Sequence, residues 1–204
     1  MIFKDFRNIE IENEIGVSSP GYDTGIVAKC ASNLKFSSAL EVGTGTGFIP
    51  IYLAKLGLNC AGSDINQKAI NCAQKNAKKN NCKINFYTSN LFEQIPVKFD
   101  LIIFNPPLGN SSSSLTNKYL EIVKSILPRH NMLVHRIAFR LFAKKQRIKL
   151  FTKFFQTCTE HLERYGRVLI FLDKSEFFLI DKRLSYEILD SYNDGNMRLA
   201  IINY

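Results

Sequence analysis

The stretch that decides the fold is Leu40-Glu41-Val42-Gly43-Thr44-Gly45-Thr46-Gly47-Phe48. Apolar residues lead into glycines at every second position, and a helical pattern follows them. Glycines at such a point let the backbone turn sharply and let a ligand approach it closely. The pattern therefore predicts a strand, a glycine-rich turn and a helix that together cradle a cofactor. Taken alone, this turn would serve a dinucleotide equally well.

Strand and helix patterns alternate around this stretch, which predicts an α/β fold with a mostly parallel sheet covered on both faces. The expected strands span residues 39–42, 60–64, 84–87, 99–104 and 166–172. The expected helices span about 24–34, 48–56, 66–80, 115–127 and 138–163. Apolar runs at 186–189 and 197–202 flank Asn193-Asp194-Gly195, which predicts an antiparallel hairpin at the end of the chain. Residues 3–17 alternate weakly and predict an arm or ribbon.

Polar residues end the second and third expected strands. Asp64 lies 23 residues after Glu41, where a carboxylate can accept both hydroxyls of a ribose. Its alternative role is to cap the helix that begins near Asn66. Asn90 follows the third strand, where an adenine edge would be read. These positions favour an adenosine-containing ligand, without separating a dinucleotide from a smaller cofactor.

A second motif, Asn105-Pro106-Pro107-Leu108, follows the buried strand over 99–104. Two prolines fix φ and remove two backbone donors, leaving stiff carbonyl groups. The Asn105 side-chain oxygen and the Pro106 carbonyl can accept the two N–H groups of a planar amine or amide. Such a nitrogen is a poor nucleophile because its lone pair is conjugated, and holding both hydrogens on acceptors makes it more reactive. The alternative is a plain turn that ends a strand.

Composition and charge place the chain among ordinary globular proteins, with 204 residues and a net charge of +9. Residues 118–183 carry this whole excess, and residues 122–159 hold nine basic residues and no acidic one. This segment is either a solvated helix face or a guide for an anionic partner: a protein, a nucleic acid or a small anionic substrate. Five cysteines without a CxxC pair predict reduced thiols, a cytoplasmic location and no metal site. No apolar run approaches the length of a membrane span.

The two motifs together resemble those of class I S-adenosylmethionine-dependent methyltransferases. Within that class the chain looks like the HemK-type group, which methylates the side-chain amide of glutamine in release factors. The resemblance is carried by residues 40–51, 62–66 and 104–108. Pro20-Gly21-Tyr22-Asp23-Thr24 is similar to a Pro-x-x-Asp-Thr segment that closes over the cofactor in short members. The resemblance covers residues 16–108 well and the final strands loosely.

The resemblance implies a Rossmann-like, seven-stranded fold and methyl transfer from S-adenosylmethionine to a planar amide or amine nitrogen, with a protein glutamine first. It implies a catalytic turn formed by Asn105, Pro106, Pro107 and Leu108. The residues that it implies for cofactor binding are Tyr22, Thr24, Glu41, Gly43, Thr44, Gly45, Gly47, Asp64, Ile65, Asn90, Leu91 and Asn105. We expect one domain over 1–204, with an arm over 1–20 and a substrate-facing loop and basic helices over 109–163.

Two departures from the family pattern keep other functions open. Leu108 stands where the family usually has an aromatic residue, and Asn90 stands where it usually has an acid. The alternatives are methylation of a nucleic-acid base, which the basic segment favours, methylation of a small molecule, and a non-catalytic cofactor-binding scaffold that needs a partner subunit. A nicotinamide-dependent oxidoreductase is disfavoured because no Tyr-x-x-x-Lys pair lies near the motifs.

Overall fold

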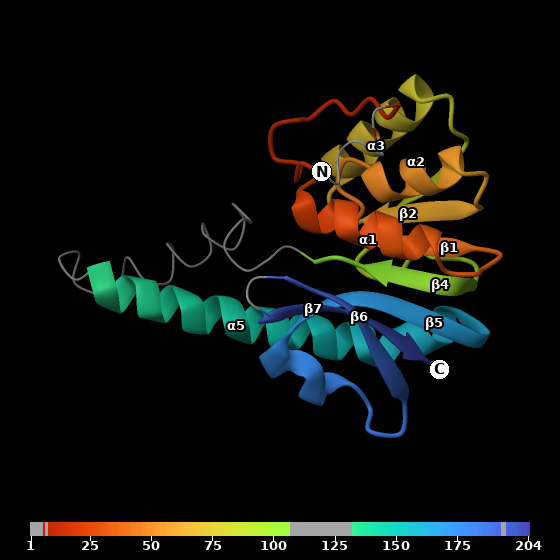
Figure 1. Cartoon of the computed structure of the whole chain (residues 1–204). Coiled ribbons are helices and arrows are strands. Elements are labelled where there is room, and N and C mark those ends of the chain that lie inside the picture. The colour runs from red at the N-terminus through yellow and green to blue at the C-terminus, as the bar shows by residue number, and fades with distance from the viewer. Residues whose placement is uncertain (1–5, 7, 107–131, 193–194) are drawn as a thin grey trace. The chain divides into compact units, whose positions relative to one another are not determined.

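The computed structural model describes residues 6, 8–106, 132–192 and 195–204. The chain divides into two compact units, residues 1–105 with 157–204 and residues 106–156. The first unit is an α/β domain built on a twisted sheet (Figure 1). Each unit is described by itself below.

The described residues form a seven-stranded sheet in the order β3-β2-β1-β4-β5-β7-β6. The first five strands in this order are parallel, and β7 runs antiparallel to both of its neighbours. Both the predicted α/β class and the predicted C-terminal hairpin are confirmed. The strand bounds are β1 Ala39–Val42, β2 Cys60–Asp64, β3 Asn85–Thr88, β4 Phe99–Phe104, β5 Leu162–Asp173, β6 Ser185–Tyr192 and β7 Met197–Asn203.

The centre of the sheet is formed by β1 and β4, whose residues are buried except for half-buried Asp100. Continuous apolar runs suit parallel strands that are covered on both faces. The register aligns Val42 of β1 with Ser63 of β2 and with Phe104 of β4. The residues that follow these strands therefore meet at one edge of the sheet, the carboxyl edge.

Three helices belong to this unit: α1 Tyr22–Ser32, α2 Phe48–Lys55 and α3 Gln67–Lys79. Helix α2 ends before Gly57, whose φ of 79° is the left-handed conformation expected of a helix stop. Helix α3 begins at Asn66, whose side chain accepts from the Lys68 backbone N–H at 3.0 Å. These helix positions agree with the sequence-based predictions to within about two residues, the usual spread at helix ends.

The sequence predicts that Asp23 and Thr24 cap α1, and this prediction is wrong. The N-cap is Gly21, and the Thr24 hydroxyl accepts from the Gly21 backbone N–H at 3.1 Å. Thr24 thus serves the helix from inside its first turn. Asp23 is left available for a longer-range contact, described below.

The helix predicted over 138–163 is also wrong, at both of its ends. Helix α5 spans Met132–Thr157, a 3₁₀ turn follows over Cys158–His161, and β5 begins at Leu162. Leu162 pairs with Phe99 of β4, so tertiary pairing overrides the helical spacing of the apolar residues. A further 3₁₀ helix, η3 Lys174–Leu179, was not predicted. The predicted loop over 109–114 and helix over 115–127 lie outside the described residues.

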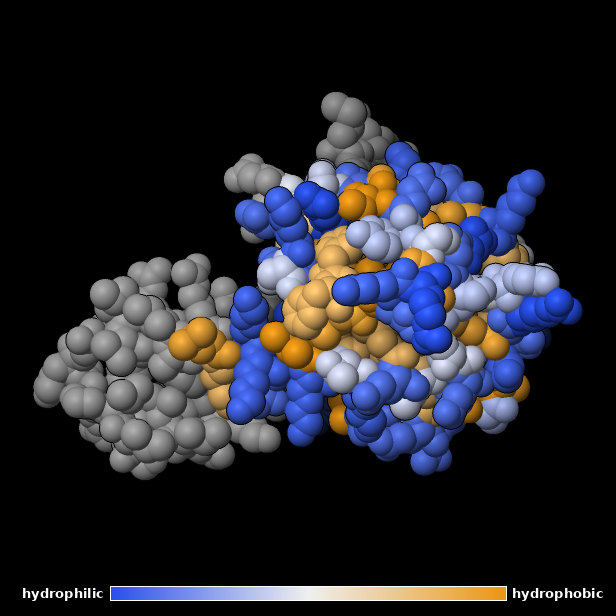
Figure 2. Space-filling model, turned by 90° about the horizontal axis from the view of Figure 1, so that it is seen from below, coloured by the Kyte–Doolittle hydropathy of each residue, from blue (hydrophilic) through white to orange (hydrophobic). Residues whose placement is uncertain are grey.

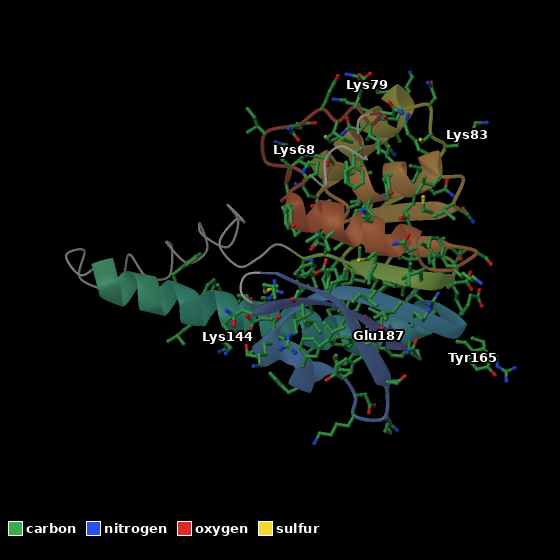
Figure 3. The ribbon with its side chains drawn as sticks, in the orientation of Figure 1. Lys68, Lys79, Lys83, Lys144, Tyr165 and Glu187 are labelled. Atoms are coloured by element: carbon green, nitrogen blue, oxygen red, sulfur yellow. The ribbon has the colours of Figure 1, made fainter. Side chains whose placement is uncertain are left out.

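Within the segment predicted as an N-terminal arm, residues 9–14 lie without strand pairing along α3. The carboxamides of Asn76 and Asn80 hold its backbone: each accepts from one arm N–H and donates to one arm carbonyl, at 2.7–3.0 Å. Asn76 and Asn80 are one turn apart on α3, while Glu12 and Glu10 are two residues apart on an extended chain, so the spacings match. Lys79, labelled in Figure 3, adds exposed ion pairs to both glutamates.

The coloured part of the face seen in Figure 2 is largely hydrophilic, with an apolar area near its middle. The exposed large hydrophobic residues of η3 and β6 are Phe178, Tyr186 and Ile188. Within the part of the chain that the structure describes, no helix is long and apolar enough to cross a membrane.

Candidate functional site

The glycine-rich turn after β1 has an unusual backbone. Gly43, Gly45 and Gly47 have φ angles of 76°, 54° and 80°, in the left-handed region that favours glycine. The N–H groups of Gly43 and Thr44 both donate to the Ser63 carbonyl of β2, at 2.7 and 2.8 Å. These two hydrogen bonds to β2 fix the point at which the turn leaves the sheet.

The surroundings of the three glycines give each a separate role. A Cβ atom on Gly47 would lie 2.9 Å from the Ala73 Cβ, so this glycine lets α2 pack closely against α3. A Cβ on Gly45 would lie 3.2 Å from the Ser18 carbonyl oxygen, at the end of the arm. A Cβ on Gly43 would meet nothing within 4 Å. Open space beside a bare backbone is what a cofactor cradle requires.

Asp64 ends β2 and binds the turn from the other side. One carboxylate oxygen accepts from the Gly45 backbone N–H at 3.0 Å, and the other accepts from the Asn66 N–H at 2.9 Å. The alternative role of Asp64, which is to support the start of α3, therefore accounts for only one of its two carboxylate oxygens. Each oxygen keeps a second lone pair, so the carboxylate can still accept from ribose hydroxyls.

Glu41 is 5% exposed and contacts the turn from within the sheet. Its Oε2 accepts from the Thr44 hydroxyl at 2.7 Å. Burial raises the pKa of the Glu41 carboxyl well above its usual range, and the nearby Asp64 carboxylate raises it further, against the opposite effect of the Thr44 bond. In this structure Glu41 therefore braces the glycine turn.

Asn105 follows β4 and is held by Asp23 of α1. The Asn105 Nδ2 donates to the Asp23 Oδ2 at 2.9 Å. The Asn105 Oδ1 is buried and has no hydrogen-bond partner in the described structure. A buried amide oxygen without a partner costs free energy, on the order of 1–3 kcal/mol, so it marks a place where a donor is expected to bind. Pro106 follows and is buried, while Pro107 and Leu108 lie outside the described residues.

The other predicted cofactor residues surround the same edge. Tyr22 is 48% exposed and Ile65 is 69% exposed. Leu91 is buried and has a left-handed φ of 56°. The Asn90 Nδ2 donates to the Glu93 carboxylate at 2.8 Å.

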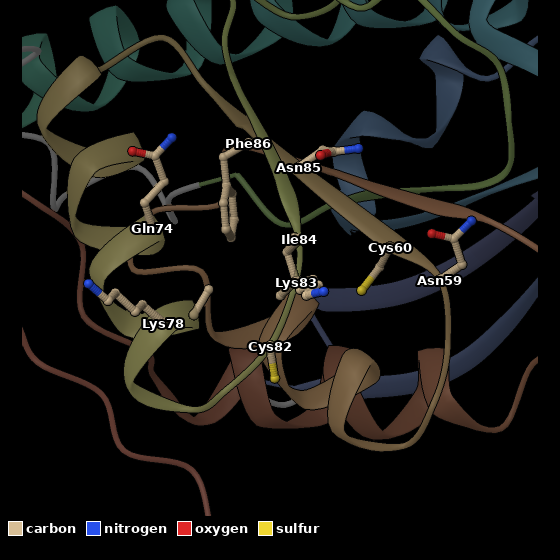
Figure 4. A pocket seen from close by; sticks show the side chains of 10 residues that line it. Asn59, Cys60, Gln74, Lys78, Cys82, Lys83, Ile84, Asn85 and Phe86 are labelled. Carbon is tan, nitrogen blue, oxygen red and sulfur yellow. The ribbon is translucent and has the colours of Figure 1, made fainter.

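One hollow lies away from this edge. It has a volume of about 510 Å³ and lies at the amino ends of β2 and β3, beside α3, where Lys78, Lys83 and Phe86 line it (Figure 4). In the described residues, no group of histidine, cysteine and acidic side chains could hold a metal ion. The five cysteines are free thiols.

Sequence reasoning missed the Asp23–Asn105 bond and the role of Asn76. Besides holding the arm, the Asn76 Nδ2 donates to the Thr46 carbonyl of the glycine turn at 3.0 Å. The spacing of Asn76 and Asn80, one turn apart on a lysine-rich helix, was a signal for such contacts, because buried carboxamides need hydrogen-bond partners.

Comparison with known proteins finds relatives that are named as methyltransferases. A Methanocaldococcus jannaschii protein, whose name provisionally assigns it as a protein N5-glutamine methyltransferase, is 39% identical over 119 residues, which are 57% of this chain and 60% of that protein. The release factor glutamine methyltransferase of Lactococcus lactis is 25% identical over 171 residues, 82% of this chain and 59% of the relative. The chain thus spans about 60% of the length of these relatives.

A solved structure shows the same fold. The Thermus thermophilus 16S rRNA N2 G1207 methyltransferase, in complex with S-adenosylmethionine and guanosine, superimposes with a TM-score of 0.63 at 13% identity, covering 91% of this chain and 44% of that one. The fold is that of class I methyltransferases. The chain belongs to the methyltransferase small domain family, whose model matches residues 8–135. The predicted methyltransferase family is thereby confirmed.

Proposed function

We propose that this domain transfers a methyl group from S-adenosylmethionine to the side-chain amide nitrogen of a glutamine in a protein. The observation that carries the proposal is the buried Asn105 Oδ1, which lacks a partner while Asp23 holds the amide nitrogen beside it. This arrangement offers an acceptor, and not a donor, to an incoming N–H group. The named relatives, which act on protein glutamines, support the same substrate.

The proposed cofactor site consists of the glycine-rich turn, the residues at and after the ends of β2 and β3, and the first turn of α1. In this proposal the bare backbone at Gly43 allows close approach, and Asp64 accepts from the ribose hydroxyls. The Asn90 carbonyl and the Leu91 backbone read the base, while Tyr22 and Thr24 border the site from α1. When bound, S-adenosylmethionine supplies a methyl group on a positively charged sulfur.

The chain's own residues activate the acceptor nitrogen by position and charge. Asn105 Oδ1 accepts one N–H of the amide, and the Pro106 carbonyl accepts the other. This geometry turns the nitrogen lone pair away from conjugation and stabilises the positive charge that grows as the N–C bond forms and the C–S bond breaks. The methylated nitrogen then loses one of its own two protons to solvent, which removes the positive charge. The Asp23 carboxylate keeps the Asn105 amide from rotating and contributes favourable charge.

Methylation of an RNA base is a second candidate, because one observation favours it. Helix α5 contains Lys144, Lys145 and Lys149, all exposed, within a segment free of acidic residues. Side chains at i and i+4 are about 6 Å apart along a helix, close to the spacing of phosphates on an RNA strand. This segment would guide an anionic partner, whichever group is methylated. Five free thiols accord with a cytoplasmic enzyme in this proposal.

The test is transfer of labelled methyl groups to a purified release factor and to total tRNA and rRNA in parallel. The proposal expects incorporation into the release factor, at a glutamine identified by mass spectrometry of its peptides. Asn105→Ala should abolish transfer while leaving cofactor binding, measured by calorimetry, within about threefold. Labelled methyl groups in RNA alone would rule out glutamine methylation and support methylation of an RNA base. Full activity of Asn105→Ala would make the site assignment wrong.

A further inference from the structure

The pairing of β4 with β5 is irregular at the end of the sheet opposite the glycine turn. Tyr165 is exposed at this irregularity. On β4, Phe99 pairs with Leu162 of β5 and Leu101 pairs with Arg167, so one residue of β4 faces four of β5, residues 163–166. The extra residues form a bulge near the start of β5. Tyr165 lies in this bulge with 75% of its surface exposed, and Figure 3 shows it at the outer end of β5.

The conformation of Tyr165 is strained. Its φ is 63°, in the left-handed region where a bulky residue is an outlier. The next residue cannot relieve it, because a Cβ on Gly166 would lie 2.9 Å from the Glu163 carbonyl oxygen and from the Leu162 side chain. Glycine would be the relaxed choice at 165. A tyrosine with its ring in solvent gains no packing that offsets the strain, so its ring is a candidate for a function.

The surroundings of the ring are basic and preorganised. The Arg164 guanidinium lies 4.9 Å from the centre of the Tyr165 ring. Tyr165 also borders a hollow of about 380 Å³, whose lining includes Lys35, Asp100 and Arg167. The Arg167 guanidinium donates to the Lys35 carbonyl, which fixes its direction.

The acidic groups near the hollow are Asp100 and Glu163. The Asp100 carboxylate is already engaged, since it accepts from the backbone N–H groups of Ser37 and Ser38 at 2.9 and 3.0 Å. Lys35, Arg164 and Arg167 therefore place three cations around this bulge and hollow. They outnumber the two carboxylates, of which Asp100 already accepts hydrogen bonds from the backbone. An aromatic face with cations around it suits a flat base that carries phosphates.

We propose that Tyr165 is a stacking platform for an unpaired base of single-stranded RNA, with Lys35, Arg164 and Arg167 meeting the adjoining phosphates. This site is separate from the methyl-transfer site. Asp100 and Asn105 stand at opposite ends of β4, five residues and roughly 16 Å apart at the rise of an extended strand. The site would anchor an RNA that accompanies the substrate, and it does not rest on which group is methylated.

The test measures binding of a labelled oligouridine to the whole protein by fluorescence anisotropy, alongside the melting temperature. Tyr165→Gly should raise the apparent Kd about tenfold, the loss of one stacked base. It should leave the melting temperature unchanged or raise it by up to about 3 °C, because the strain is removed. Tyr165→Phe should keep both values. Arg164→Gln should reduce the salt dependence of binding by about one phosphate contact.

Phe178→Ala is the matched control, since Phe178 is also an aromatic residue that is 69% exposed, and it should leave RNA binding unchanged. Unchanged RNA affinity in Tyr165→Gly would overturn the proposal. So would weakened binding in Tyr165→Phe, because the hydroxyl group and not the face of the ring would then carry the contact. Binding of an acidic peptide in place of oligouridine, dependent on Tyr165, would also overturn it.

Discussion

The Asn105 amide group donates to the Asp23 carboxylate at 2.9 Å, a contact between residues 82 positions apart. It joins the end of the central strand β4 to the first turn of α1. Because a carboxylate only accepts hydrogen bonds, the bond decides which end of the amide is the nitrogen. The oxygen of Asn105 must then point to the other side, where it is buried without a partner. Asp23 is therefore a positioning residue for the acceptor that the proposed reaction uses.

Asp23→Ala should lower kcat about 30-fold, or about 2 kcal/mol, because the Asn105 amide would no longer be held in one orientation. Cofactor affinity, measured by calorimetry, should change less than threefold. Asp23→Asn should retain part of the activity, since an amide oxygen can still accept the same bond. A loss of cofactor affinity equal to the loss of rate would instead place Asp23 in the cofactor site.

The central strands could be predicted from the sequence because their signals are local. Residues 39–42, 60–64 and 99–104 are apolar runs bounded by glycine, proline or acidic residues, and the structure has the same bounds. The end of α5 could not be predicted in this way. Leu162 continues the helical spacing of Phe151 and Phe154, yet it pairs with Phe99, and a pairing partner 63 residues away leaves no local signal.

The residues of the candidate site could be proposed from the sequence, but the hydrogen bonds between them could not. The glycines and Asp64 form recognisable motifs, so their place at the carboxyl edge follows from the order of strands. The bond from Asp64 to Gly45 and the bond from Asn105 to Asp23 depend on how separate elements meet. Asp23 also looked like a helix cap, a role that the structure gives to the Gly21–Thr24 pair.

Asn76 should be a structural node that joins the arm, α3 and the glycine turn. Its side chain makes hydrogen bonds of 2.9–3.0 Å to Glu12 and Thr46, and it is 1% exposed. Asn76→Ala should lower the free energy of unfolding by about 2–3 kcal/mol, because buried groups lose their partners. It should also expose the arm to proteolysis. Asn71→Ala on the exposed face of α3 is the control, with a change below about 0.5 kcal/mol.

Glu41 should make stability depend on pH. Its pKa is raised in the folded protein, so the folded state binds more protons than the unfolded chain above about pH 4.5. The contribution of Glu41 is therefore fully present below that pH and is lost as pH rises toward the folded pKa. Glu41→Gln keeps an acceptor for Thr44 without a charge. Its melting temperature relative to the natural protein should rise between about pH 5 and pH 8, and a parallel pair of curves would contradict this.

Gly43 should be required for the cofactor rather than for the fold. Gly43 and Gly57 have nearly the same φ, 76° and 79°, and a Cβ on either would meet nothing within 4 Å. Alanine at either position should therefore cost about 1 kcal/mol of backbone strain. Only Gly43→Ala places a methyl group in the proposed cradle, so only it should weaken S-adenosylmethionine binding by tenfold or more, about 1.4 kcal/mol. Calorimetric titration and thermal melts on both variants separate strain from contact, and equal affinities would remove Gly43 from the cofactor site.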